Sequence, residues 1–129
     1  MKILNRFKKI LIVEDDRPLR SALVDKLSRE GYRVSYAKDG REGLRMANEE
    51  KPHMILLDQM LPGLDGLSFL KELRNPNDPW GLNVPVLVIT ALGETDERRV
   101  RTAEYNVVDY FDKAQHSIED IVAKVKEVL

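Results

Sequence analysis

Six polar residues of this sequence follow short apolar segments and could together carry metal or phosphoryl chemistry. They are three consecutive acids, a later aspartate, a threonine and a lysine: Glu14, Asp15 and Asp16, Asp58, Thr90, and Lys113. Carboxylates that gather at one place repel one another and are costly to leave uncompensated. A hard divalent cation is their natural partner, and Mg²⁺ suits them best because it takes one or two carboxylates, keeps waters and accepts phosphate oxygens.

The residues around Asp58 predict how one of these carboxylates is presented. Met54–Leu57 contains no polar residue, so it is typical of a strand covered on both faces, and Pro62, Gly63 and Gly66 exclude regular structure directly after it. In open α/β sheets, ligands bind at the carboxyl ends of the strands. Asp58 is therefore predicted to lie at that edge, where a carboxylate is more often chemical than structural.

Five short apolar segments alternate with amphipathic ones, which predicts a doubly wound parallel sheet with helices on both faces. The expected strands are Ile10–Val13, Tyr32–Tyr36, Met54–Leu57, Val84–Ile89 and Val107–Phe111. The first, third and fourth are continuously apolar, as interior strands are, whereas the second and fifth mix polar and apolar residues and belong at the edges. This favours an α/β, flavodoxin-like fold with strand order 2-1-3-4-5. Because adjacent strands lie about 4.8 Å apart, the strand ends place their polar side chains in one pocket.

Five helices are expected between and after the strands. Their predicted positions are Asp16 to Gly31, a second helix capped by Asp39, about Leu67 to Arg74, about Thr95 to Tyr105, and Ser117 to the last residue. Asp16 is interpreted as a helix N-cap rather than a metal ligand. The segment 75–83 is predicted to be neither helix nor strand because it is rich in turn residues, and Trp80 is expected to pin this loop to the body of the domain.

The composition predicts one domain over residues 1–129, with its core at about 9–129, since 129 residues with 43% hydrophobic content build one ordinary core. A net charge of −1 gives no overall field toward nucleic acid or an anionic membrane. The absence of cysteine excludes thiolate chemistry and fits a reducing compartment, so a cytoplasmic location is expected. The first apolar run is too short for a signal peptide or a membrane span.

In their order and spacing, these residues resemble the receiver domain of two-component response regulators, from about Lys9 to Leu129. The matching motifs are the acidic pair after Val13, the run from Leu57 to Gly66, Thr90-Ala91, and Lys113 after Asp109-Tyr-Phe-Asp112. Each motif is weak alone, but all four in order are specific. The strand order 2-1-3-4-5 is already known for this family, so it is not an independent finding.

The resemblance implies a phosphorylation-activated signalling switch. Asp58 would accept a phosphoryl group from a histidine of a sensor kinase or phosphotransfer protein, or from a small donor such as acetyl phosphate. Asp15, with help from Glu14, would hold Mg²⁺, and Asp58 and the backbone carbonyl of Met60 would complete the protein ligands. Lys113 would neutralise phosphoryl oxygens.

The resemblance further implies how the switch is read. Thr90 would donate its hydroxyl to the new phosphoryl group, and Tyr110 would turn inward as the switch aromatic. The protein would be no metabolic enzyme, catalysing only its own phosphorylation and slow autodephosphorylation. Its expected partners are the kinase or phosphotransfer protein and a downstream protein, without direct nucleic-acid or membrane binding by this chain, and a phosphorylation-dependent dimer is one open oligomeric state.

Three other classes of function compete with this interpretation. A phosphorylation-independent protein-binding module would not need Glu14, Asp15, Asp58, Thr90 and Lys113 all intact. An aspartyl-nucleophile phosphotransferase commonly needs a second aspartate two residues after the first, and the sequence has methionine there. A flavin carrier of the same topology would want a phosphate-cradling loop where three acids stand.

The sequence departs from the family near the site. Most receivers place a proline in a cis peptide after the lysine, but here Ala114 follows Lys113. A cis bond without proline costs about 2.5–4 kcal/mol, so a trans peptide with a rearranged loop is predicted. Met60 and Leu92 occupy the positions that flank the hydrolytic water in receivers. Both are apolar, so slow dephosphorylation is expected. Asn106-Val-Val108 also replaces a usual Gly-Ala pair, so the surface around Tyr110 is expected to be atypical.

Overall fold

The computed structural model describes residues 7–90, 101 and 103–129. Its centre is a five-stranded, all-parallel sheet in the order β2-β1-β3-β4-β5, as predicted. The strands are β1 (Lys9–Val13), β2 (Arg33–Ala37), β3 (Met54–Asp58), β4 (Val86–Thr90) and β5 (Asp109–Asp112). The predicted strands agree with these within two residues at each end.

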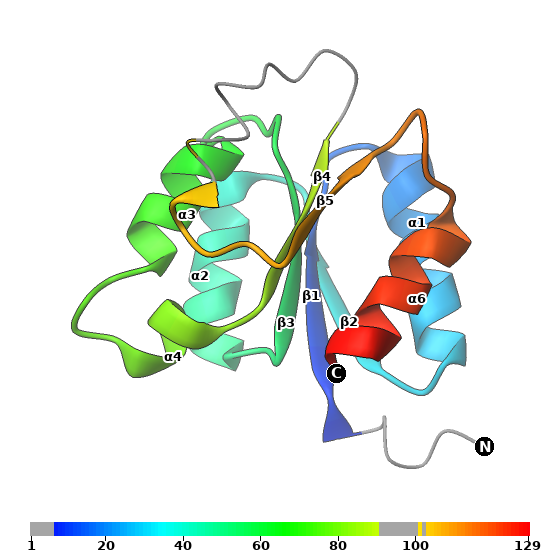
Figure 1. The fold of residues 1–129 in the computed structure, drawn as a ribbon, viewed down its shortest axis with the longest axis horizontal. Coiled ribbons are helices and arrows are strands. Elements are labelled where there is room, and N and C mark those ends of the chain that lie inside the picture. Colours follow the sequence, from blue (N-terminus) through cyan, green and yellow to red (C-terminus); the bar gives the residue numbers. More distant parts are fainter. Residues whose placement is uncertain (1–6, 91–100, 102) are drawn as a thin grey trace.

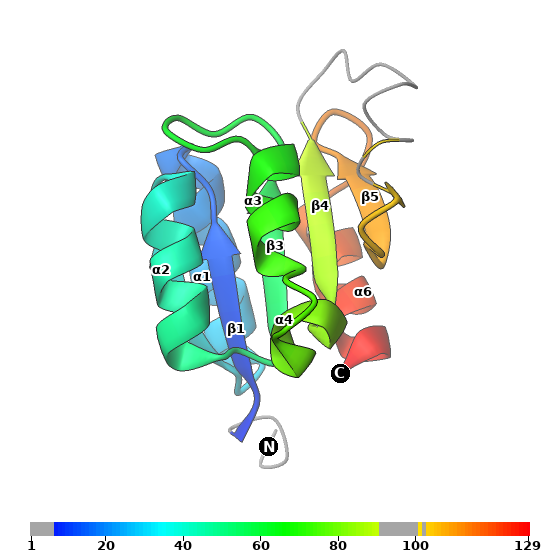
Figure 2. The same cartoon turned by 90° about the vertical axis from the view of Figure 1, so that its left-hand side faces the viewer.

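Helices cover both faces of the sheet. The described helices are α1 (Arg17–Arg29), α2 (Gly40–Glu50), α3 (Gly66–Leu73), α4 (Pro79–Asn83) and α6 (Ile118–Val128). Figure 1 shows the sheet nearly edge-on, with α2, α3 and α4 on one face and α1 and α6 on the other. Figure 2 looks onto the first of these faces. None of the described helices is long and apolar enough to cross a membrane.

The burial of each strand explains its place in the sheet. All five residues of β3 and of β4 are buried, and β1 is buried except at Lys9. β2 and β5 each bury only one residue fully. Side chains alternate between the two faces of a strand, so the interior strands supply two separate cores, one under α2 and α3 and the other under α1 and α6. The prediction of interior and edge strands from apolar continuity is confirmed.

Polar side chains cap the starts of four helices, which sets where the chain leaves the carboxyl edge of the sheet. Asp16, Asp39, Asp65 and Ser117 each accept a hydrogen bond from the backbone N–H three residues further on. Such caps satisfy donors that have no partner within the helix. The interpretation of Asp16 as an N-cap is confirmed, since its Oδ2 lies 3.2 Å from the nitrogen of Leu19.

The prediction that segment 75–83 contains no helix is wrong, because α4 forms there. Its start is locally favoured, since Pro79 occupies the first turn, where the missing N–H costs nothing. Its end is held from outside: the Arg74 guanidinium donates to the carbonyls of Gly81 and Val84 at 2.8 and 2.7 Å. The Trp80 indole donates to the carbonyl of Pro52 at 3.1 Å, which confirms that Trp80 pins this segment.

Two predictions concern residues that the structure describes only in part. The helix expected over about Thr95 to Tyr105 falls mostly outside the described residues, although Arg101 and Ala103 within it are helical. Leu92 lies wholly outside them. Asn106, which follows this segment, has a positive φ of 63°, a left-handed conformation that asparagine tolerates better than most residues.

Candidate functional site

The ends of β1 and β3 bring three carboxylates together. Val13 is paired with Leu57 in the sheet, so the residues that follow them, Glu14 and Asp58, leave neighbouring strands at the same level. One carboxylate oxygen from each of Glu14, Asp15 and Asp58 lies within 4.8 Å of the others. Glu14 and Asp58 are 1% and 2% exposed, whereas Asp15 is open to solvent. The predicted gathering of acids at this edge is present.

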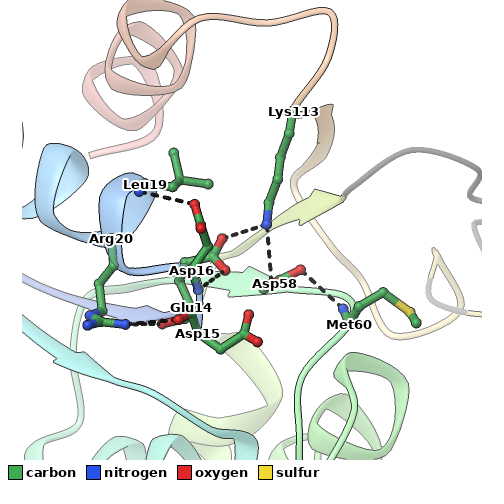
Figure 3. A network of polar contacts seen from close by, with 8 residues as sticks. All are labelled: Glu14, Asp15, Asp16, Leu19, Arg20, Asp58, Met60 and Lys113. Carbon is green, nitrogen blue, oxygen red and sulfur yellow. Dashed lines mark hydrogen bonds and ion pairs between the residues drawn. The ribbon is translucent and has the colours of Figure 1, made fainter.

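Lys113 reaches this cluster from the end of β5. Its Nζ lies 2.9 Å from Glu14 Oε1 and 3.3 Å from Asp58 Oδ2 (Figure 3). Its backbone N–H donates to the carbonyl of Thr90 at 2.8 Å, which fixes the turn that aims the side chain. Burial by itself lowers the pKa of Lys113, but the two carboxylates outweigh burial and leave that pKa above its usual value. Lys113 is therefore a permanent positive charge between two acids.

Glu14 carries the strongest electrostatic perturbation in the site. Burial, together with hydrogen bonding to Asp58 and the negative charge of that residue, raises the pKa of Glu14 from 4.5 to about 8. Lys113 and the backbone N–H of Asp16, which lies 3.1 Å from Glu14 Oε2, act in the opposite direction but do not cancel these effects. A cation bound at this edge would oppose these effects, because a nearby positive charge favours the ionised form of a carboxyl group.

The loop after β3 is folded around Asp58. The backbone N–H of Met60 donates to Asp58 Oδ1 at 3.1 Å, and Met60 is 54% exposed. Gly66 closes the loop by donating to the carbonyl of Gln59 at 3.0 Å. A Cβ at Gly66 would lie 3.0 Å from Gln59 Cα and 3.2 Å from the carbonyl oxygen of Asp58. A glycine is therefore favoured here for close backbone approach, in addition to its predicted role in excluding regular structure directly after the strand.

Thr90 and Tyr110 lie on the neighbouring strands. Asp58 is paired with Ile89, and Thr90, the next residue, ends β4 and is buried. Tyr110 is paired with Val88 and is half-buried, with its side chain packed against the core cluster under α2 and α3. The peptide bond between Lys113 and Ala114 is trans, as predicted. In the loop after it, the N–H of Ala114 donates to Asp112 Oδ1 at 2.8 Å.

Sequence reasoning missed two arginines that hold the site and its surroundings. Arg20 is 7% exposed, and its Nη1 donates to the carbonyls of Glu14 and Asp15 at 3.1 and 3.3 Å. Arg20 precedes Leu23 by three residues, so both lie on the buried face of α1. This spacing was the signal from which the burial of Arg20 could have been predicted. Arg74 binds the carbonyl of Tyr105 at 2.9 Å in addition to its two contacts with α4 and the residue after it. No local pattern in the sequence marks that role.

The fold and the site define a doubly wound α/β domain with buried acids and a lysine at the carboxyl edge of its sheet, and comparison with known proteins identifies the family. The profile of the response regulator receiver domain matches residues 10–126. The chain belongs to this family, the receiver domains of two-component response regulators. This is a signalling rather than a catalytic family.

Named relatives and solved structures agree with this assignment. The chain is 37% identical over 121 residues to the response regulator MprA of Mycolicibacterium vanbaalenii, covering 94% of this chain and 50% of that protein. It is 37% identical over 122 residues to the phosphate regulon transcriptional regulatory protein PhoB of Escherichia coli, covering 95% and 52%. The receiver domain of the Francisella response regulator 1452 is 30% identical with a TM-score of 0.81, covering 94% and 95%. The chain thus spans about half the length of the curated relatives named here.

Proposed function

We propose that this receiver domain, with its core at about residues 9–129, is switched by transfer of a phosphoryl group to Asp58. The observation that carries the proposal is the position of Lys113 Nζ, 2.9 Å from Glu14 and 3.3 Å from Asp58, with the Asp15 carboxylate in the same cluster. A buried carboxylate held between a fixed cation and further acids is arranged for phosphoryl chemistry, which needs positioning and charge neutralisation more than a strong base.

The transfer itself is a displacement at phosphorus. An oxygen of the Asp58 carboxylate attacks, the bond from phosphorus to the histidine nitrogen of the donor breaks, and the electron pair leaves with the imidazole. Lys113 is within reach of the Asp58 carboxylate and would neutralise the phosphoryl oxygens as the group arrives. In the acyl phosphate product, the loop that Met60 and Gly66 hold around Asp58 limits how the group is oriented.

The residues present fit a magnesium ion. The donor set is all oxygen, which Mg²⁺ prefers, and one oxygen from each of three carboxylates lies within 4.8 Å of the others. Asp15, Asp58 and the backbone carbonyl of Met60 would hold the ion, with Glu14 assisting. When bound, Mg²⁺ would supply neutralisation of the phosphoryl oxygens that Lys113 does not reach.

We further propose that Thr90 and Tyr110 report phosphorylation to a protein partner. Thr90 ends the strand next to Asp58, and Tyr110 lies one strand further out and half-buried. The proposed donors are a sensor histidine kinase or a histidine phosphotransfer protein in the cytoplasm, and slow loss of the phosphoryl group would reset the switch. We propose readout through proteins, without direct nucleic-acid binding by this chain, because its net charge is −1.

Intact-protein mass spectrometry after incubation with Mg²⁺ and acetyl phosphate tests the site. The chain should gain one phosphoryl group, and Asp58→Asn should gain none. Asp25→Asn, which changes an exposed aspartate of α1 in the same chemical way, serves as the matched control and should be phosphorylated normally. Undiminished phosphorylation of Asp58→Asn would show that another residue is the acceptor. No phosphorylation of the unaltered chain would favour a phosphorylation-independent binding module.

A further inference from the structure

A second polar hollow lies between α1 and the edge strand β2, outside the site described above. It has a volume of about 520 Å³ and is lined by Arg17, Arg20, Ser21, Val24, Tyr36 and Lys38. This volume falls within the range of about 300–1,000 Å³ that is usual for small-molecule sites. Three of the lining residues are cations and none is acidic, so the hollow concentrates positive charge in a protein whose net charge is −1.

Two of these cations are not used by the fold. Arg17 and Lys38 are exposed, and neither forms an ion pair or side-chain hydrogen bond in the part of the chain that the structure describes. Like-charged side chains on one wall repel one another, and an anion placed between them would relieve that repulsion. The exposed hydroxyl of Ser21 adds a neutral donor to the same wall.

Arg20 supplies the fixed element of the hollow. Arg20 is 7% exposed, and its Nη1 donates to the carbonyls of Glu14 and Asp15 at 3.1 and 3.3 Å. Its guanidinium carbon lies 5.2 Å from the centre of the Tyr36 ring. In the described residues Nη2 and Nε have no protein acceptor. A guanidinium whose position is already held loses little conformational freedom when it binds an anion.

We propose that this hollow binds a small phosphate ester of nucleoside type. The phosphate would lie among Arg17, Arg20 and Lys38, since guanidinium groups match the geometry of phosphate oxygens. The organic part would contact Val24, which is half-buried, and Tyr36, which is 45% exposed. The proposal does not depend on phosphorylation of Asp58, because none of its ligating residues belongs to the acidic cluster.

Titration of the full chain with AMP, adenosine and inorganic phosphate, followed through backbone amide resonances, tests the proposal. The buffer contains no Mg²⁺ and has constant ionic strength, so the acidic cluster does not recruit phosphate. AMP should shift the amides of Ser21, Tyr36 and Lys38 with saturation, and adenosine should not. Equal affinity for AMP and inorganic phosphate would support the phosphate site and assign it to free phosphate instead of an ester.

Charge-removing variants separate this site from the acidic cluster. Arg17→Gln and Lys38→Gln should each weaken AMP binding by about tenfold, as expected for loss of one charge-assisted hydrogen bond. Lys113→Gln, the matched control at the other site, should bind AMP as the unaltered chain does. Absence of saturable shifts with AMP and phosphate, shifts confined to residues around Asp58, or unchanged affinity in both hollow variants would each overturn the proposal.

Discussion

Replacing Glu14 with glutamine should make the stability of the metal-free protein far less sensitive to pH. Glu14 is 1% exposed, and its pKa rises from 4.5 to about 8 because burial and Asp58 disfavour its charged form. The folded state therefore binds this proton more tightly than the unfolded state does. Stability is retained below the unfolded-state pKa and is lost as the pH rises from 4.5 through about 8.

The size of the effect follows from the same shift. Each pH unit between the two pKa values, 4.5 and about 8, corresponds to about 1.4 kcal/mol, so the free energy of unfolding should fall by an amount on the order of 5 kcal/mol across this interval. Glu14→Gln has no proton to lose and should remove most of that fall. Mg²⁺, added to the unaltered chain, should restore much of the lost stability at high pH because it neutralises the same acids.

The free energy of unfolding, measured with urea at a series of pH values with and without Mg²⁺, tests this prediction. Glu72→Gln is the matched control, since Glu72 is exposed on α3 and, among the described residues, forms an ion pair with Arg41 alone, at 3.8 Å. The control should keep the pH slope of the unaltered chain. If Glu14→Gln shows that same slope, the burial and Asp58 contact of Glu14 do not govern its protonation, and the electrostatic reasoning fails.

Three further outcomes are expected. Asp15→Asn should weaken Mg²⁺ binding more than Asp16→Asn does in a metal titration, because Asp15 lies in the acid cluster and Asp16 caps α1; equal losses would contradict this. Met60→Asn combined with Leu92→Glu should speed decay of the phosphorylated protein roughly tenfold, or about 1.4 kcal/mol of barrier, by orienting the attacking water; an unchanged or slower decay would show that these side chains do not gate it. Arg74→Met should lower the free energy of unfolding, measured by denaturant titration, by about 3 kcal/mol, because it leaves without a donor the carbonyls that Arg74 now binds. A loss under about 1 kcal/mol would mean that water replaces the guanidinium as the donor.

The sequence by itself determined the sheet and the place of the site. An uninterrupted apolar run such as Met54–Leu57 indicates a strand buried on both faces, and a mixed run indicates a strand at the edge of the sheet, because apolar residues favour burial and polar residues favour contact with water. Acids and turn residues that directly follow such runs must lie at the carboxyl edge. Those inferences need only neighbours along the chain, and the structure confirms them for Glu14, Asp58 and Lys113.

Only the tertiary structure decided which polar groups meet. The helix α4 forms in a segment of turn residues because Arg74 binds carbonyls seven and ten residues away, and the same side chain reaches Tyr105, thirty-one residues away. The pKa of Glu14 depends on an aspartate from another strand, and the wall of the hollow depends on α1 lying beside β2. Such contacts depend on distances in space, which the composition and periodicity of a single segment do not carry.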